Sequence, residues 1–329
     1  MNCALITGGL GFIGTFISKQ LLEEKHVDKI ICLDNFGRYA SSIRENFIDY
    51  RNLRFNFFGD KMIIERGDTK YHTIIHKILD KYKPIYIFHL AALPLAKLDN
   101  LSVEEALEGS VISTTNLIEY IGYLKKTSNY CPRKFVYTSS SMVYGDFKSE
   151  TVAEDQIPKP KEIYGIMKYS GETITQGLCE FYGIDYCIIR PSAVYGPTDM
   201  NKRVVQTFIE KAINGERIKI MGKDEYLDFT YVKDTANGFV LAATNQSVQS
   251  EIFNITYGKA HSLLELVDIL KIEFNDLKYE ILERDKSRPK RGTLSIKKAY
   301  EMLGYKPKYN LKDGIKNYIE FIKNNKLSI

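Results

Sequence analysis

Short apolar runs alternate with longer amphipathic stretches through the first two-thirds of the 329-residue chain. Compact apolar runs are typical of buried strands, whereas apolar residues spaced three and four apart are typical of helices. The pattern predicts strands over 3–7, 29–33, 54–58, 85–90, 134–138 and 186–190. It predicts helices over 12–24, 71–81, 102–125 and 162–181. Such alternation is typical of a parallel sheet with helices on both faces.

The order of elements loosens after residue 190, where Pro191, Gly196 and Pro197 mark a loop. Shorter helices and strands then alternate with polar segments. We therefore predict an α/β protein with a doubly wound parallel sheet over 1–190 and a smaller lobe over 191–329. Elements near 253–255 are expected to return to the main sheet.

The charged residues exclude some classes of partner. Lys and Arg number 46 against 41 Asp and Glu, a net charge of +5, and they are spread along the chain without a long basic block. This distribution favours anionic small molecules over nucleic acid. The five cysteines and five histidines are scattered without metal-binding spacing, and no segment is apolar enough to span a membrane. We expect a cytoplasmic protein without a metal site.

A glycine-rich loop follows the first predicted strand and precedes the first predicted helix. Its sequence, T-G-G-L-G-F-I-G, places glycines at Gly8, Gly9, Gly11 and Gly14. Glycines permit a tight turn, let the backbone approach a pyrophosphate and allow the helix to pack closely on the sheet. The N–H groups at the start of the helix then face the anion. We interpret the loop as a phosphate cradle in a Rossmann-type fold.

An acid ends the second predicted strand, about 20 residues after the glycines, as dinucleotide binding requires. This residue is Asp34. A carboxylate can bind the 2′-hydroxyl of a ribose and repels a 2′-phosphate. The sequence therefore predicts NAD rather than NADP.

A phenol and an amine stand four residues apart on one predicted helix, at Tyr164 and Lys168. Residues with this spacing share a helix face. A neighbouring Lys⁺ stabilises a phenolate, so the pair predicts a tyrosine that accepts protons. It follows a strand that ends in hydroxyls, F-V-Y-T-S-S-S-M-V-Y-G over 135–145.

Taken together, these motifs resemble the extended short-chain dehydrogenase/reductases, and within them the NAD-dependent nucleotide-sugar epimerase/dehydratase branch. The resemblance covers nearly the whole chain. It rests on motifs in the family's order: T-G-G-x-G-x-x-G, Asp34, Gly67-Asp68, H-L-A-A over 89–92, S-S-S-x-V-Y-G, Y-x-x-x-K and R-P-x-x-V-Y-G-P.

The resemblance implies a role for each matched position. Tyr164 would be the catalytic base, Lys168 would lower its pKa and bind the nicotinamide ribose, and Ser140 would bind the reacting oxygen of the substrate. The residues expected at the cofactor are Gly8, Gly11, Phe12, Ile13, Gly14, Asp34, Asn35, Asp68, Thr69, Leu90, Ala91, Ala92, Tyr164 and Lys168. The residues expected at the substrate are Ser141, Arg203, Arg288 and Arg291. The domain over 1–190 would bind NAD, and most of 191–329 would hold the sugar nucleotide.

Departures from the family pattern bear on the reaction. The T-D-E of 4,6-dehydratases is replaced by Ser140-Ser141-Met142, so dehydration is not expected. Two contacts usual for the sugar nucleotide are replaced by Ala193 and Leu227. These changes, and a composition similar to that of Campylobacter capsule proteins, favour a 4-dehydrogenase of the GDP-manno-heptose type. A nucleotide-sugar 4-epimerase is the alternative, followed by a non-catalytic NAD-binding scaffold. Family resemblance also implies a homodimer or higher homo-oligomer.

Overall fold

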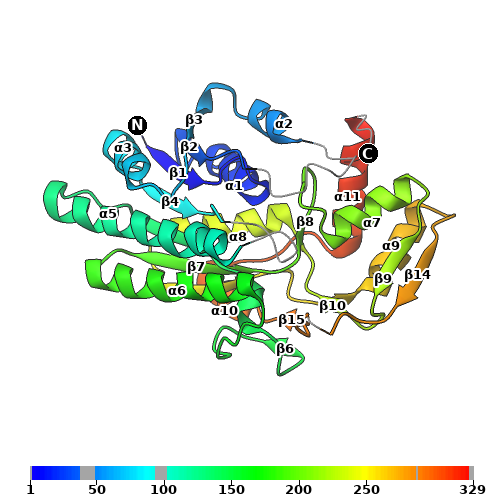
Figure 1. Ribbon diagram of the computed structural model, residues 1–329. Helices are drawn as coiled ribbons and strands as arrows, with labels where there is room; N and C mark the ends of the chain where they lie inside the picture. The colour runs from blue at the N-terminus through cyan, green and yellow to red at the C-terminus, as the bar shows by residue number, and fades with distance from the viewer. Residues whose placement is uncertain (1, 38–48, 93–101, 287, 326–329) are drawn as a thin grey trace.

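The computed structural model describes residues 2–37, 49–92, 102–286 and 288–325. A parallel sheet of seven strands lies at its centre, in the order β12-β7-β5-β4-β1-β2-β3 (Figure 1). The strands are β1 (Cys3–Thr7), β2 (Lys29–Asp34), β3 (Met62–Arg66), β4 (Tyr86–His89), β5 (Lys134–Thr138), β7 (Tyr186–Pro191) and β12 (Glu251–Ile255). The chain starts in the middle of the sheet and winds outward in both directions, which confirms the predicted Rossmann-type fold.

Helices cover both faces of this sheet, so its central strands are buried on both sides. One face packs against α1 (Phe12–Glu23), α8 (Val232–Thr244) and α10 (Lys297–Leu303). The other packs against α3 (His72–Tyr82), α5 (Ser113–Ser128) and α6 (Ile163–Tyr182). All five residues of β1 are buried, which is why the first strand reads as an unbroken apolar run.

The predicted strand over 54–58 is wrong. This segment is largely helix α2 (Arg51–Asn56), and the third strand is formed instead by the next apolar run, which is β3. Tertiary contacts override the local pattern here. Arg54 is buried whereas Phe55 and Phe57 are exposed, the reverse of what polarity alone would give.

The predicted helix over 102–125 has a break in its regular geometry. It consists of α4 (Val103–Leu107), a π-helical turn η3 (Glu108–Ile112) and α5. A π-turn inside a helix is often found beside a functional site. Two residues of this turn, Glu108 and Gly109, line the cavity described below.

Part of the second half of the chain surrounds a hydrophobic core of its own, and we call these elements the smaller lobe. The lobe includes α7 (Val204–Ile213), β9 (Ile218–Met221), α9 (Leu263–Glu273), β14 (Tyr279–Leu282) and α11 (Leu311–Asn324), which gather at one end of the sheet (Figure 1). Strand β12 also comes from this half and pairs with β7. In the described ranges, no helix is long and apolar enough to cross a membrane.

Candidate active site

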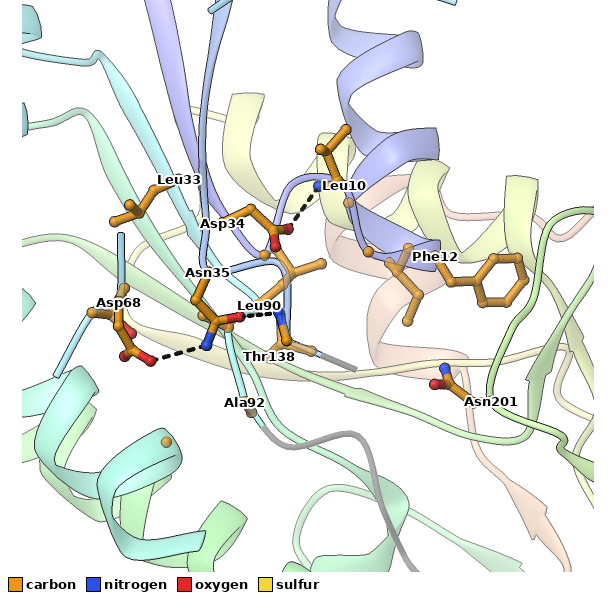
Figure 2. A pocket seen from close by; sticks show the side chains of 18 of the residues that line it. Leu10, Phe12, Leu33, Asp34, Asn35, Asp68, Leu90, Ala92, Thr138 and Asn201 are labelled. Atoms are coloured by element: carbon orange, nitrogen blue, oxygen red, sulfur yellow. Dashed lines mark hydrogen bonds between the residues drawn. The ribbon is translucent and has the colours of Figure 1, made fainter. Parts of the chain in front are cut away.

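A cavity of about 550 Å³ opens at the carboxyl ends of β1, β2, β4 and β5. Strand order reverses between β1 and β4, which is where doubly wound sheets bind their ligands. Figure 2 shows Asp34 and Asp68 on one side of this cavity and Asn201 on the other. Of the residues expected at the cofactor, all fourteen line it: Gly8, Gly11, Phe12, Ile13, Gly14, Asp34, Asn35, Asp68, Thr69, Leu90, Ala91, Ala92, Tyr164 and Lys168.

The glycine loop has no room for side chains where it turns. Gly8 has φ +67°, and a Cβ there would lie 3.2 Å from the backbone N of Ala91. A Cβ on Gly14 would lie 2.8 Å from the carbonyl oxygen of Gly8. No side chain caps the amino end of α1 at Gly11, so the N–H groups of its first turn can bind an anion. These features fit a dinucleotide pyrophosphate.

Asp34 is held in place by the loops around it (Figure 2). Its carboxylate accepts hydrogen bonds from the backbone N of Leu10 at 3.1 Å and of Phe36 at 2.9 Å. Burial raises the pKa of this carboxyl group, and the two N–H donors lower it. The acid is thus held in a fixed position at the cavity wall.

Replacing Asp34 with Ala is expected to weaken NAD binding by about 1–3 kcal/mol, because a buried hydrogen bond from a ligand to a charged group is lost. Isothermal titration of NAD and NADP measures the change. Asp60→Ala, at an exposed acid after α2, is the control and should leave both affinities unchanged. An Asp34→Ala protein that binds NAD as before would contradict this role.

The loop after β4 is positioned by a buried histidine. His89 Nδ1 lies 2.8 Å from the hydroxyl of Thr7, and Nε2 lies 3.1 Å from the hydroxyl of Thr114. Burial lowers the pKa of His89 to about 3, so the ring is neutral. Thr7 in turn accepts a hydrogen bond from the backbone N of Ala91 at 3.0 Å. The H-L-A-A motif therefore fixes one wall of the cavity.

One residue of the cavity wall has a hydroxyl group without a hydrogen-bond partner among the described residues. The hydroxyl of Thr138, at the end of β5, is buried and has no hydrogen-bond partner in the described structure. Thr138 lines the cavity beside Tyr164 and Lys168. A ribose or carboxamide group of NAD would supply the missing partner. Together with the glycine cradle and Asp34, this orphaned hydroxyl shows that the residues present fit NAD.

Tyr164 and Ser140 lie near one another at the end of β5. Burial raises the pKa of Tyr164, whereas the positive charge of Arg203 and the neighbouring hydroxyl of Ser140 lower it. The amine of Lys168 lies 6.0 Å from the centre of the Tyr164 ring and donates to the carbonyl oxygen of Thr138 at 2.7 Å. Arg203, from the loop before α7, is thus the cation whose charge lowers the pKa of Tyr164 in this structure.

The pKa of Lys168 reflects its burial first and then a carboxylate one turn further along α6. Burial lowers the pKa of Lys168 to about 7, and the charge of Glu172 opposes that shift. Glu172 is fully buried and accepts hydrogen bonds from Arg190 at 2.8 and 2.7 Å and from the hydroxyl of Ser139. A buried ion pair therefore lies directly behind the amine.

The four residues expected at the substrate lie in different places, and only one of them lines the cavity. Arg203 lines the cavity with Tyr164. Ser141 is buried in the turn η4 (Ser141–Tyr144). Arg288 is exposed and paired with Asp285 at 3.2 Å, and neither it nor Arg291 lines this cavity. Burial and the charge of Arg288 lower the pKa of Arg291 to about 10.

Several residues that line the cavity were not predicted from the sequence. They include Arg51, Arg54, Glu105, Glu108, Thr138, Met200 and Asn201. Thr138 could have been found as the first hydroxyl of the cluster that ends β5. The others stand on elements remote in sequence from the glycine loop, and no local spacing marks them.

A family model described as "NAD dependent epimerase/dehydratase family" matches residues 4–256. The chain belongs to this family. It is therefore an NAD-dependent enzyme of the nucleotide-sugar epimerase/dehydratase type, as its cavity and motifs indicate. The specific resemblance to a GDP-heptose 4-dehydrogenase finds no such support.

Relatives match over nearly the full length of the chain. A protein of Methanocaldococcus jannaschii provisionally named a UDP-glucose 4-epimerase is 32% identical over 98% of both chains. The UDP-glucuronic acid 4-epimerase of Bacillus cereus, in complex with UDP-glucuronic acid and NAD, has a TM-score of 0.87 at 26% identity and covers 98% and 99% of the two chains. The UDP-glucose 4-epimerase of Thermotoga maritima, with UDP-glucose, has a TM-score of 0.82 at 27% identity, over 99% and 100%.

Proposed function

We propose that this protein is an NAD-dependent 4-epimerase of a UDP-sugar. The observation that carries the proposal is the grouping of Tyr164, Ser140, Lys168 and Arg203 at the end of β5, beside a cavity that fits NAD. The names of its full-length relatives support C4 epimerisation and a UDP-sugar. They favour this alternative over the GDP-heptose 4-dehydrogenase expected from the sequence.

The chemistry follows from the proton donors and acceptors present. Bound NAD supplies a reversible hydride acceptor. Tyr164 takes the proton of the sugar 4-hydroxyl as the hydride leaves C4, and it returns that proton when C4 is reduced on the opposite face. Ser140 holds the C4 oxygen by a hydrogen bond, and Arg203 favours the phenolate through its charge. The proton and the hydride removed from the sugar at C4 are both returned to it, so no external oxidant is consumed.

Water elimination is not part of the proposed reaction. It requires an acid and a base beside C5 and C6. The turn that follows β5 offers Ser141 and Met142 at the positions where dehydratases have two acids. Neither side chain exchanges protons at neutral pH. We therefore expect sugars to keep their C6 oxygen.

The test is to incubate the protein with UDP-, GDP- and dTDP-sugars in deuterated water and to follow the products by NMR. Equilibration of two C4 epimers of a UDP-sugar is the expected result. Accumulation of a 4-keto sugar with C6 still oxygenated would identify a 4-dehydrogenase instead. A 4-keto-6-deoxy product would contradict both reactions, and no product from any sugar would favour an NAD-binding scaffold.

A cytoplasmic homodimer or higher homo-oligomer remains a prediction. The long helices α5 and α6 run side by side (Figure 1) and expose apolar side chains, among them Tyr123 at 55% and Phe181 at 74%. A second copy of the chain would cover such residues. Sedimentation at micromolar concentration distinguishes the dimer from a monomer.

A further inference from the structure

The guanidinium of Arg54 joins two loops that both contribute residues to the cavity wall. Arg54 lies on α2, is 1% exposed and lines the cavity. Its Nη1 donates to the carbonyl oxygen of Leu10, in the glycine loop, at 2.5 Å. Its Nη2 donates to the carbonyl oxygen of Thr198, and Nε donates to the Thr198 hydroxyl at 3.3 Å. Burial lowers the pKa of Arg54 to about 10, so it stays charged at neutral pH.

Thr198 belongs to the loop over 196–203, between β8 (Val194–Tyr195) and α7. The same loop brings Met200, Asn201 and Arg203 to the cavity wall, where Arg203 acts on Tyr164. We name this segment the substrate-side loop.

The conformation of the substrate-side loop needs support from outside. Thr198 has φ +70°, a strained value for a β-branched residue. Such strain persists only where the surroundings hold it. The next residue, Asp199, is fully buried, and its charge lies near that of Arg54. The hydrogen bonds from Arg54 to Thr198, and the attraction between the charges of Arg54 and Asp199, hold the loop in place.

At its other end, Arg54 connects to the acid expected to bind the adenosine ribose. The residue whose carbonyl it binds, Leu10, donates its own N–H to Asp34 at 3.1 Å (Figure 2). A chain of hydrogen bonds thus runs from Asp34 through Leu10 and Arg54 to Thr198. It connects the cofactor side of the cavity to the loop that carries Arg203.

We propose that Arg54 is a positioning residue that couples NAD binding to sugar-nucleotide binding, by fastening the substrate-side loop to the glycine loop. The inference rests on the proposed function for its second ligand. When NAD binds against the glycine loop, Arg54 holds Thr198 to that loop and therefore keeps Arg203 at the cavity wall. Linkage requires the reverse effect as well, so a bound nucleotide tightens the binding of NAD.

The test measures the NAD dissociation constant by equilibrium dialysis with labelled NAD, with and without saturating UDP, and again with GDP. For the unmodified protein we expect the nucleotide to tighten NAD binding by roughly 5- to 150-fold, the usual range of coupling between two sites. In Arg54→Met the ratio of the two constants is expected to fall to about 1, although both ligands still bind. Arg54→Lys keeps the charge but not the forked geometry, so its ratio of the two constants should lie between 1 and that of the unmodified protein.

If Arg54 serves stability alone, Arg54→Met would lower the unfolding temperature and leave the ratio of the two NAD dissociation constants unchanged. Arg217→Met, at an exposed side chain of the smaller lobe, is the control and should keep the native ratio. If Arg54→Met does not fold, Arg54→Lys decides, and a native ratio in a folded Arg54 variant overturns the proposal. If a nucleotide binds the unmodified protein without changing its NAD dissociation constant, the proposed coupling is overturned and the proposed function is not. Failure of both UDP and GDP to bind overturns the proposed function as well.

Discussion

Tyr164→Phe is expected to lower kcat by about 10²–10⁴-fold, the usual contribution of a positioned acid–base group. The variant removes the hydroxyl that lies near Ser140 and keeps the ring. NAD is expected to remain bound, because the glycine cradle, Asp34 and the Thr138 hydroxyl are untouched. The NMR assay of C4 epimers measures turnover, and mass analysis of the supernatant after denaturation measures retained NAD(H).

Tyr169→Phe is the matched control, since Tyr169 lies on the same helix and is 36% exposed. It should keep full activity. Unchanged turnover in Tyr164→Phe would mean that another group moves the proton. Loss of NAD together with activity would mean that the phenol serves cofactor binding first.

Arg190→Met is expected to destabilise the protein by about 3–5 kcal/mol, because it leaves the buried charge of Glu172 without its cation. The pair is 2.7 Å apart, with side chains 3% and 1% exposed. Arg190 also donates to the hydroxyl of Tyr144 at 2.9 Å, which would lose that donor. Equilibrium unfolding in urea measures the change in the free energy of unfolding.

Two comparisons make this second prediction specific. Arg133→Met, at an exposed position, should change the free energy of unfolding by less than about 0.5 kcal/mol. The double variant Arg190→Met, Glu172→Leu should recover part of the loss, because neither charge is then buried alone. A double variant as unstable as the sum of the single changes would show that the pair does not act as a unit.

Local pattern was sufficient wherever a residue's role depends on its chain neighbours. The five buried residues of β1 read as a strand because the central strand of a parallel sheet is buried on both faces. The glycines of the loop were found from sequence because their spacing follows the turn from that strand into α1. Asp34 ends the neighbouring strand, so its distance along the chain also predicts its place in the cavity.

Positions that depend on contacts between distant segments could not be read in this way. Residues 54–58 look like a strand, yet they are largely helical because Arg54 is buried against carbonyl groups of Leu10 and Thr198. The cation that lowers the pKa of Tyr164 is likewise 39 positions away in sequence, at Arg203.

The sequence by itself therefore determined the doubly wound sheet, the cradle for a dinucleotide and the Tyr164–Lys168 pair, since strand burial, turn geometry and helix spacing are local properties. Only the tertiary structure decided which cations reach the cavity and how its two sides are joined. It places Arg203 at Tyr164, leaves Arg288 at the surface and puts Arg54 between the loops. Long charged side chains go where distant backbone carbonyls and buried acids stabilise them, and that depends on the packing of the whole chain.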